Sequence, residues 1–335
     1  MRFLNWRRGT KAAGLLAVLL IGGTATAVNT EPSSSSAPVT SGVANSAAPP
    51  TSPPPAQGGP EFAIPTRLDA MGRVLAPVMV NGQGPFRFIL DTGANRSVLS
   101  PHLLDILKLT LDANSKINVH GVTGSAVLPA VHLDRLQAGA LTLARDTLVP
   151  VLAQTVLARA DGILGVDGLK MARIEIDFAK DKVRIIPATG RQSAPSGYLT
   201  IPADISHGSL LTVPAKVGHI TARAIIDTGA ERTLGNNALR EALLLSRRHG
   251  VEEQGTTVFG ATPDISVGTS ISAPTIYIGE AELHNLVITF GDLHVFEMWG
   301  LERQPALLIG MDLLGSVERL IIDYRREELQ VKPRS

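Results

Sequence analysis

Cysteine is absent from this chain of 335 residues, and aromatic residues make up only 4% of it. Without cysteine the protein forms no disulfide and no thiolate zinc site, and it has no Cys nucleophile. Cysteine usage therefore does not identify the redox compartment. Hydrophobic residues nevertheless account for 44% of the chain. We expect a sizeable core, built mainly from Val, Ile, Leu and Ala.

An excess of charge of either sign is also missing. The 31 basic and 30 acidic residues leave a formal net charge of +1, and no charge run stands out in the part expected to fold. Nucleic-acid binding needs a clustered basic face, so no nucleic-acid partner is predicted. The eight histidines are scattered, with no HExxH motif and no close pair. We therefore predict no metal and no other cofactor. A serine triad stays open from sequence alone, although no Gly-x-Ser-x-Gly elbow is present.

The N-terminus has the pattern of a secretory signal. It begins with Arg2, Arg7, Arg8 and Lys11, continues with the apolar stretch 12–21, and ends with Ala25-Thr26-Ala27. We predict a signal peptide over residues 1–27, cleaved after Ala27, and export to a bacterial periplasm or out of the cell. The apolar run is shorter than the roughly 20 residues of a membrane span, so no stable span is predicted after cleavage. An uncleaved signal anchor is the alternative.

The next segment, residues 28–60, consists mostly of Ser, Pro, Ala, Thr and Gly. Such a composition buries too little apolar surface to offset the entropy lost on ordering. We predict a disordered tether that carries no site, followed by folded sequence from near Phe62.

The remainder of the chain is an internal repeat. Asp91-Thr92-Gly93-Ala94 in the first copy corresponds to Asp227-Thr228-Gly229-Ala230 in the second, and Ile163-Leu164-Gly165 corresponds to Leu308-Ile309-Gly310. Two closing strands follow in each copy, at 173–178 and 182–186 and at 320–324 and 329–331. Four landmarks in one order predict two homologous lobes, 61–190 and 195–335, divided near the Pro- and Gly-containing stretch 187–197.

Both copies consist mainly of short Val/Ile/Leu-rich segments bounded by Gly, Pro, Asn or Asp, which predicts a mostly β fold. A strand pair precedes each Asp-Thr-Gly and turns at Asn81-Gly82 or at Gly218-His219. Two longer helices are predicted: 102–109, with Ser100 as N-cap and Pro101 in the first turn, and 238–245, capped by Asn236 or Asn237. Short helices are expected at 168–172 and 313–316.

A single Asp-Thr-Gly is typical of an ordinary turn. Two copies, each directly after an apolar strand, favour a chemical role for Asp91 and Asp227. Peptide hydrolysis needs a base that activates water and an acid that polarises the carbonyl. Two carboxyls that share one proton supply both, because charges so close together cannot both ionise.

Four neighbouring residues are predicted to support these carboxyls. The hydroxyls of Thr92 and Thr228 can hydrogen-bond across to the facing loop. Gly93 and Gly229 let the backbone approach the carboxylates closely, where its N–H groups can donate to them.

A second matched set follows the two loops. Arg96 and Arg232 lie five residues after the aspartates, and Asp167 and Asp312 lie two residues after the glycines of the second motif. These are either four unrelated surface charges or one Arg–Asp pair in each lobe that ties the loop to the helix behind it. Their matched placement favours the pairs.

Together, these motifs resemble the retroviral-type, or retropepsin-like, aspartic peptidases. The resemblance extends from about residue 62 to 333. It implies a mostly β fold with two β-barrel-like lobes and short helices, an active-site cleft between the lobes, and flaps over the cleft. The expected flaps are 120–124, around Gly121, and 259–262, around Gly260.

Departures from related families refine this interpretation. Retroviral enzymes carry one copy and dimerise, whereas this chain carries two and is expected to act as a monomer. Pepsin-like enzymes usually have Ser or Thr where this chain has Ala94 and Ala230, and they use a flap tyrosine that neither expected flap contains. No basic, helical prosegment is visible. A duplicated, bacterial-style retropepsin is favoured.

The sequence thus predicts an exported aspartic endopeptidase that cleaves polypeptides with Asp91 and Asp227. A peptide-binding module without catalysis, on the same two-lobed fold, is the alternative.

Overall fold

A computed structural model describes residues 64–65, 68–69, 71–139, 141–188, 194–246 and 253–334. The predicted signal peptide and tether lie outside these ranges, as do Phe62 and the middle of the predicted boundary between the lobes. None of the helices in the described ranges has the length and hydrophobicity needed to span a bilayer.

The N-terminal lobe is built on a seven-stranded sheet with the order β4-β8-β3-β2-β6-β5, in which β7 also pairs with β6. Its strands are β2 (Leu75–Val80), β3 (Gln83–Leu90), β4 (Val98–Leu99), β5 (Asp112–His120), β6 (Ser125–Ala138), β7 (Leu141–Pro150) and β8 (Gly162–Leu164). Asn81 and Gly82 join β2 to β3 with φ values of 49° and 78°, because this hairpin turn needs two residues with positive φ.

The C-terminal lobe repeats this plan in a ten-stranded sheet, ordered β16-β17-β20-β15-β21-β14-β13-β18-β19, with β12 paired to β13. Its strands are β12 (Asp204–Ser206), β13 (Leu210–Val217), β14 (Ile220–Ile226), β15 (Leu234–Gly235), β16 (Glu253–Phe259), β17 (Ile265–Ser272), β18 (Ile276–Ile278), β19 (Ala281–Leu283), β20 (Val287–Gly291) and β21 (Ala306–Ile309). The mostly β, two-lobed fold predicted from the repeat is confirmed.

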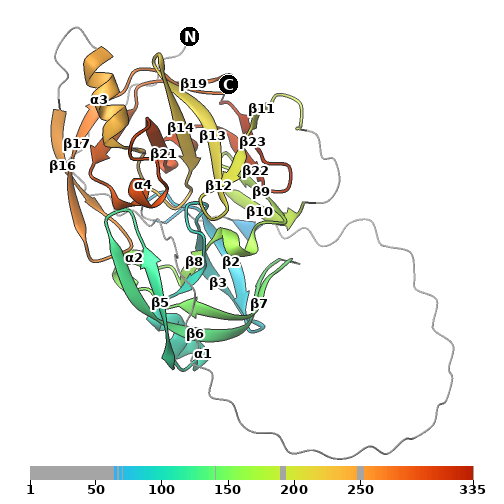
Figure 1. Cartoon of the computed structure of the whole chain (residues 1–335). Helices are drawn as coiled ribbons and strands as arrows, with labels where there is room; N and C mark the ends of the chain where they lie inside the picture. Colours follow the sequence, from blue (N-terminus) through green and yellow to red (C-terminus); the bar gives the residue numbers. More distant parts are fainter. Residues whose placement is uncertain are drawn as a thin grey trace, which may run out of the picture.

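A third sheet joins the two lobes. Its order is β1-β10-β9-β22-β23-β11, so each lobe contributes three strands. The strands are β1 (Ile64–Pro65), β9 (Ala172–Asp177), β10 (Lys182–Pro187), β11 (Leu199–Pro202), β22 (Arg319–Asp323) and β23 (Glu328–Lys332). At its centre β9 pairs antiparallel with β22, from Arg173 opposite Asp323 to Asp177 opposite Arg319. Figure 1 shows β9 and β10 in green beside β22 and β23 in red.

One face of this shared sheet carries a buried polar network centred on Arg173. Its guanidinium donates to Asp323 at 3.1 Å, to Gln330 at 3.1 Å and to Glu175 at 3.0 Å. Arg173 and Asp323 come from different lobes, and both are buried. Without Arg173, Asp323 would be left as a buried charge that has lost its ion-pair partner, which is strongly destabilising.

We expect Arg173→Ala to lower the free energy of unfolding by about 3–5 kcal/mol, since it leaves Asp323 buried without its cation. Arg223→Ala is the matched control: Arg223 pairs with Asp204 at 3.2 Å, but both side chains are largely exposed, so the loss should stay within about 1 kcal/mol. Urea unfolding followed by circular dichroism measures both. Equal losses in the two variants would contradict the structural importance of the network.

The predicted caps of the two longer helices are confirmed. Ser100 caps α1 (Pro101–Leu107) by accepting from the Leu103 N–H at 3.0 Å. Asn236, rather than Asn237, accepts from the Leu239 N–H at 2.9 Å at the start of α3, because Asn237 already lies within that helix. The remaining helices are α2 (Gln154–Leu157), the 3₁₀ helix η1 (Val166–Gly168), α3 (Asn237–Ser246), α4 (His294–Met298) and α5 (Met311–Leu314).

Two predicted short helices are displaced. The helix expected at 168–172 is η1, which ends at Gly168, and that expected at 313–316 is α5, which begins at Met311. Both begin directly after the glycine of the second motif, because the backbone turns there as soon as the buried strand ends. Neither α2 nor α4 was predicted, since each is only one turn long.

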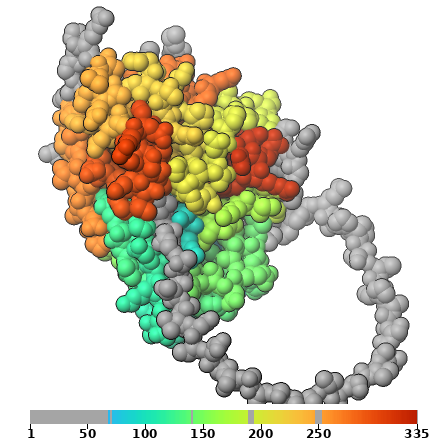
Figure 2. Space-filling model, viewed as in Figure 1, coloured from blue at the N-terminus to red at the C-terminus, as the bar shows by residue number. Residues whose placement is uncertain are grey.

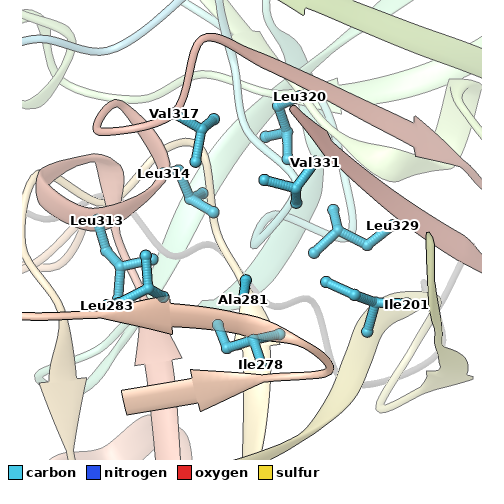
Figure 3. Close-up of a pocket in the computed structure, with 10 residues that line it drawn as sticks. All are labelled: Ile201, Ile278, Ala281, Leu283, Leu313, Leu314, Val317, Leu320, Leu329 and Val331. Atoms are coloured by element: carbon cyan, nitrogen blue, oxygen red, sulfur yellow. The ribbon is translucent and has the colours of Figure 1, made fainter. Parts of the chain in front are cut away.

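An apolar cavity lies between the shared sheet, the β18–β19 hairpin and α5 (Figure 3). All of its lining side chains are hydrophobic, among them Ile278, Leu313, Leu320 and Val331. None of them belongs to the two Asp-Thr-Gly loops. The cavity is therefore a feature of the core and not part of the candidate active site.

Candidate active site

The two aspartates occupy equivalent positions, each directly after a buried strand. Asp91 follows β3 and its N–H donates to the Leu164 carbonyl at 3.0 Å, while Asp227 follows β14 and donates to Ile309 at 3.0 Å. Parallel pairing of β3 with β8, and of β14 with β21, sets these contacts. Each second motif thus supports the Asp-Thr-Gly loop of its own lobe.

The two loops are hydrogen-bonded to each other through their threonines. The Thr92 hydroxyl donates to the Ile226 carbonyl at 2.7 Å and accepts from the Thr228 N–H at 3.1 Å. In return, the Thr228 hydroxyl donates to the Leu90 carbonyl at 2.6 Å and accepts from the Thr92 N–H at 3.2 Å. Four hydrogen bonds with pseudo-twofold symmetry therefore fix the position of one loop relative to the other.

The glycines bring backbone against the carboxyls. Gly93 N–H donates to Asp91 Oδ1 at 2.9 Å, and Gly229 N–H donates to Asp227 Oδ1 at 2.8 Å. A Cβ at Gly93 would overlap the Asp227 carboxyl, and a Cβ at Gly229 would overlap that of Asp91. Each glycine is therefore required by the aspartate of the opposite lobe.

The two carboxyls form a coupled, desolvated pair. Both aspartates are fully buried, and neither Oδ2 accepts a hydrogen bond from another group of the described protein. Burial, then repulsion by Asp227 and a hydrogen bond between the two side chains raise the pKa of Asp91 well above its usual value. Burial also raises the pKa of Asp227, to about 6, although its hydrogen bond with Asp91 opposes the rise. The two carboxyls therefore titrate as one coupled pair, whose buried position favours keeping a proton on it.

Two buried residues near Asp91 and Asp227 were not predicted from the sequence. Arg73 is fully buried before β2, pairs with Asp69 at 2.6 Å, and its charge lowers the pKa of Asp91. Tyr324, directly after β22, has a buried hydroxyl with no hydrogen-bond partner among the described residues. Burial, followed by the negative charges of Asp91 and Asp227, raises its pKa. Neither lies in a motif, so no local signal indicated them.

The prediction that Asp167 and Asp312 form ion pairs with the arginines is wrong, because each aspartate is held by a different residue. Asp167 accepts from the Ser97 hydroxyl at 2.8 Å and from its N–H at 3.1 Å. In the same way Asp312 accepts from the Thr233 hydroxyl at 2.7 Å and N–H at 3.0 Å. The loop is thus tied to the helix behind it, but by the hydroxyl residue that follows each arginine, because the backbone turns this side chain inward.

The expected flaps are the tips of two long hairpins. The N-terminal tip (residues 120–125) joins β5 to β6, and Gly121 N–H closes it on the Gly124 carbonyl at 2.7 Å. The C-terminal tip (residues 259–264) joins β16 to β17 and contains Gly260, which lies against Thr123. The hydroxyls of Thr123 and Thr262 are 3.2 Å apart. The tips therefore meet.

Each tip is also buried in the opposite lobe. Val122 belongs to an apolar cluster whose other members, such as Ala230 and Phe296, come from the C-terminal lobe. Ala261 belongs to a cluster whose other members, such as Ala94 and Ile89, come from the N-terminal lobe. Figure 2 shows the blue-green part of the chain against the orange part. Each tip therefore packs beside the residue that follows the Asp-Thr-Gly of the opposite lobe.

Within the described ranges, no group of three or more His, Asp or Glu side chains is arranged to hold a metal ion. The sequence had suggested that no two histidines lie close together. In the structure, however, His120 and His294 are in contact. Residues 174 positions apart become neighbours only through the packing of the lobes.

Two buried carboxyls on paired Asp-Thr-Gly loops, in a two-lobed β fold, define the class of aspartic-protease folds. A family model described as aspartyl protease matches residues 76–167 and 213–313, more than half of the chain. The chain therefore belongs to the aspartyl protease family, in a duplicated, retropepsin-like form. Each matched segment holds one Asp-Thr-Gly and one second motif. No curated protein matches the chain.

Proposed function

We propose that this protein is an aspartic endopeptidase that hydrolyses peptide bonds with a water activated by Asp91 and Asp227. One observation carries the proposal: two fully buried carboxyls from different lobes interact with each other, and neither Oδ2 has a hydrogen-bond partner elsewhere in the described protein. Such a pair can hold one proton and one negative charge at the same time.

Each residue has a chemical role in this proposal. Asp227, whose charged form is favoured by its hydrogen bond with Asp91, is the base that takes a proton from water. Asp91 holds the shared proton and donates it to the peptide carbonyl as the water attacks. Thr92 and Thr228 keep the loops in register, and Gly93 and Gly229 donate to the carboxylates. The tips around Gly121 and Gly260 would hold an extended peptide as an added strand. No cofactor enters this chemistry.

The repeat also supports a monomer, since one chain supplies both aspartates. We propose the lobe boundaries 61–190 and 195–335, as well as export through the N-terminal signal. Chromatography with light scattering, and N-terminal sequencing of the secreted protein, test these two points.

The function is tested by incubating the protein with a peptide library and sequencing the products. Internal cleavage that is absent from Asp91→Asn supports the endopeptidase. Peptide binding without cleavage by the wild type would favour the alternative of a non-catalytic binding module.

The rate of cleavage should fall as the pH becomes alkaline. The dyad needs one proton, and burial followed by repulsion from Asp227 raises the pKa of Asp91 well above 3.8. The reactive, singly protonated form is therefore lost as the pH rises through the upper apparent pKa of the pair. The measurement is kcat/KM between pH 4 and 9 on a substrate without titrating groups; a rate still rising at pH 9 contradicts a shared proton.

A further inference from the structure

A pair of histidines connects the N-terminal tip to the opposite lobe. His120, the last residue of β5, has its Nδ1 3.2 Å from Nε2 of His294, the first residue of α4. The rings are tilted by 34° with their centroids 5.5 Å apart, so the contact is a hydrogen bond rather than a stack. Next to it, the Val295 N–H donates to the Val122 carbonyl at 3.4 Å.

This hydrogen bond depends on the protonation of both rings. One ring nitrogen must donate and the other accept, so at least one of the two imidazoles must be neutral. When both rings are protonated, both facing nitrogens carry hydrogen and both rings are positive. The contact then becomes repulsive instead of attractive.

A carboxylate lies next to His294, and an amide lies next to His120. Glu297, also on α4, lies 3.6 Å from Nδ1 of His294, the nitrogen that does not face His120. Next to His120 Nε2 is the neutral amide of Asn118, at 3.4 Å. Other ionisable side chains on neighbouring segments include Lys116 on β5, Asp264 against Gly124, and Asp292 before α4. Protonation of His120 while His294 is charged breaks the bond.

We propose that His120 and His294 form a latch that holds the N-terminal tip closed over the aspartates and releases it when both rings are protonated. They are positioning residues, since they act through the tip and not on the reacting atoms. The inference rests on the proposed function, because closing and opening matter only if a peptide must reach Asp91 and Asp227.

The direction of the pH effect follows from linkage. Burial, and then repulsion by His294, lowers the pKa of His120 from its ordinary 6.5. The closed form thus binds this proton less tightly than an open form does. The stability of the closed form is complete above about pH 6.5 and is lost as the pH falls below it. The buried aspartates act in the opposite direction, because their raised pKa values favour closure at low pH. If the N-terminal tip opens on acidification, the histidines and not the aspartates are therefore the groups responsible.

The absence of cysteine makes opening directly measurable. Val122, in the N-terminal tip, is fully buried against the C-terminal lobe, so Val122→Cys places the only thiol of the full-length chain where the reagent reaches it when the tip leaves that lobe. The rate of labelling by 4,4′-dithiodipyridine, which reacts at acid pH, is measured from pH 4.5 to 8 and divided by the rate of the unfolded protein. We expect slow labelling at pH 8 and a rise of up to about tenfold per pH unit below 6.5, the limit for one proton taken up on opening.

Two substitutions at one position separate the charge from the hydrogen bond. His294→Gln keeps an amide near the position of Nε2 and cannot titrate, so labelling should stay slow at all pH values. His294→Leu removes the bond, so labelling should be fast even at pH 8. His102→Gln, at an exposed histidine on α1, is the matched control and should keep the acid-dependent rise.

Each labelling measurement is repeated in a protein that also carries Asp91→Asn, in which the proposed cleavage cannot occur. The same differences between the His294 variants there would support the latch whether or not the protein is a peptidase. If His294→Gln keeps the full acid-dependent rise, the latch is wrong. If His294→Leu is unfolded, the His294→Gln arm still decides the question.

Discussion

Asp91→Asn and Asp227→Asn should each reduce peptide cleavage by about 10³-fold or more, because a single carboxyl cannot supply both the base and the acid. An amide in place of either carboxyl keeps the shape of the side chain but removes the shared proton. The measurement is kcat/KM for a peptide found in the library screen, with active and variant proteins purified side by side. Substantial activity in either single variant would show that the two aspartates do not act as a pair.

Thermal unfolding provides the control for these variants. The raised pKa values mean that the pair contributes stability below the ordinary carboxyl pKa and loses it as the pH rises through the folded-state values. Replacing one carboxyl with an amide removes much of this loss. We therefore expect the Tm of Asp91→Asn to equal or exceed that of the wild type at pH 7, with a difference that shrinks toward pH 4. A strongly lowered Tm would attribute the inactivity to misfolding instead.

Gly229→Ala and Gly93→Ala should cost about 10²-fold in kcat/KM, the loss expected when reacting groups are displaced by about 1 Å. A Cβ at either position overlaps the carboxyl of the opposite aspartate, and that carboxyl is buried and hydrogen-bonded, so it cannot move without breaking the pair. KM should change much less than kcat, because the displaced groups act on the reacting bond rather than on the rest of the peptide.

Gly255→Ala is the matched control for the glycines. Gly255 lies in β16, and a Cβ there meets nothing within 4 Å. Its kcat/KM should remain that of the wild type. Equal losses at Gly255 and Gly229 would mean that the contact between glycine and carboxyl is not the cause.

Features encoded in short stretches of sequence were predicted well. The Asn81-Gly82 turn, the Ser100 cap and the two Asp-Thr-Gly loops depend on residues close to one another along the chain. Duplication made the pairing of Asp91 with Asp227 predictable, because a motif that needs a partner occurs twice.

Features that depend on distant segments were not accessible in the same way. The closing strands were recognised from the sequence. Their alternation of apolar and polar residues does not indicate which strands are neighbours, however, so the pairing of β9 with β22 was not predicted. Arg173 gave no sign of burial, because its partner Asp323 lies in the other lobe. The contact of His120 with His294 escaped for the same reason. The matched arginines were preferred over Ser97 and Thr233 because charge is conspicuous in a sequence and backbone direction is not.

The shared sheet has a consequence for the order in which the protein is made. Synthesis proceeds from the N-terminus, so β9 and β10 exist before β22 has left the ribosome. Until then β9 has an edge with unsatisfied backbone N–H and C=O groups, and the apolar face that should pack beneath the sheet lacks part of its cover. The N-terminal half therefore completes its fold only after nearly the whole chain is available, and the nascent protein passes through a state prone to aggregation. Contacts between β9 and β22 also join residues up to 150 positions apart in the chain, which makes their formation slow.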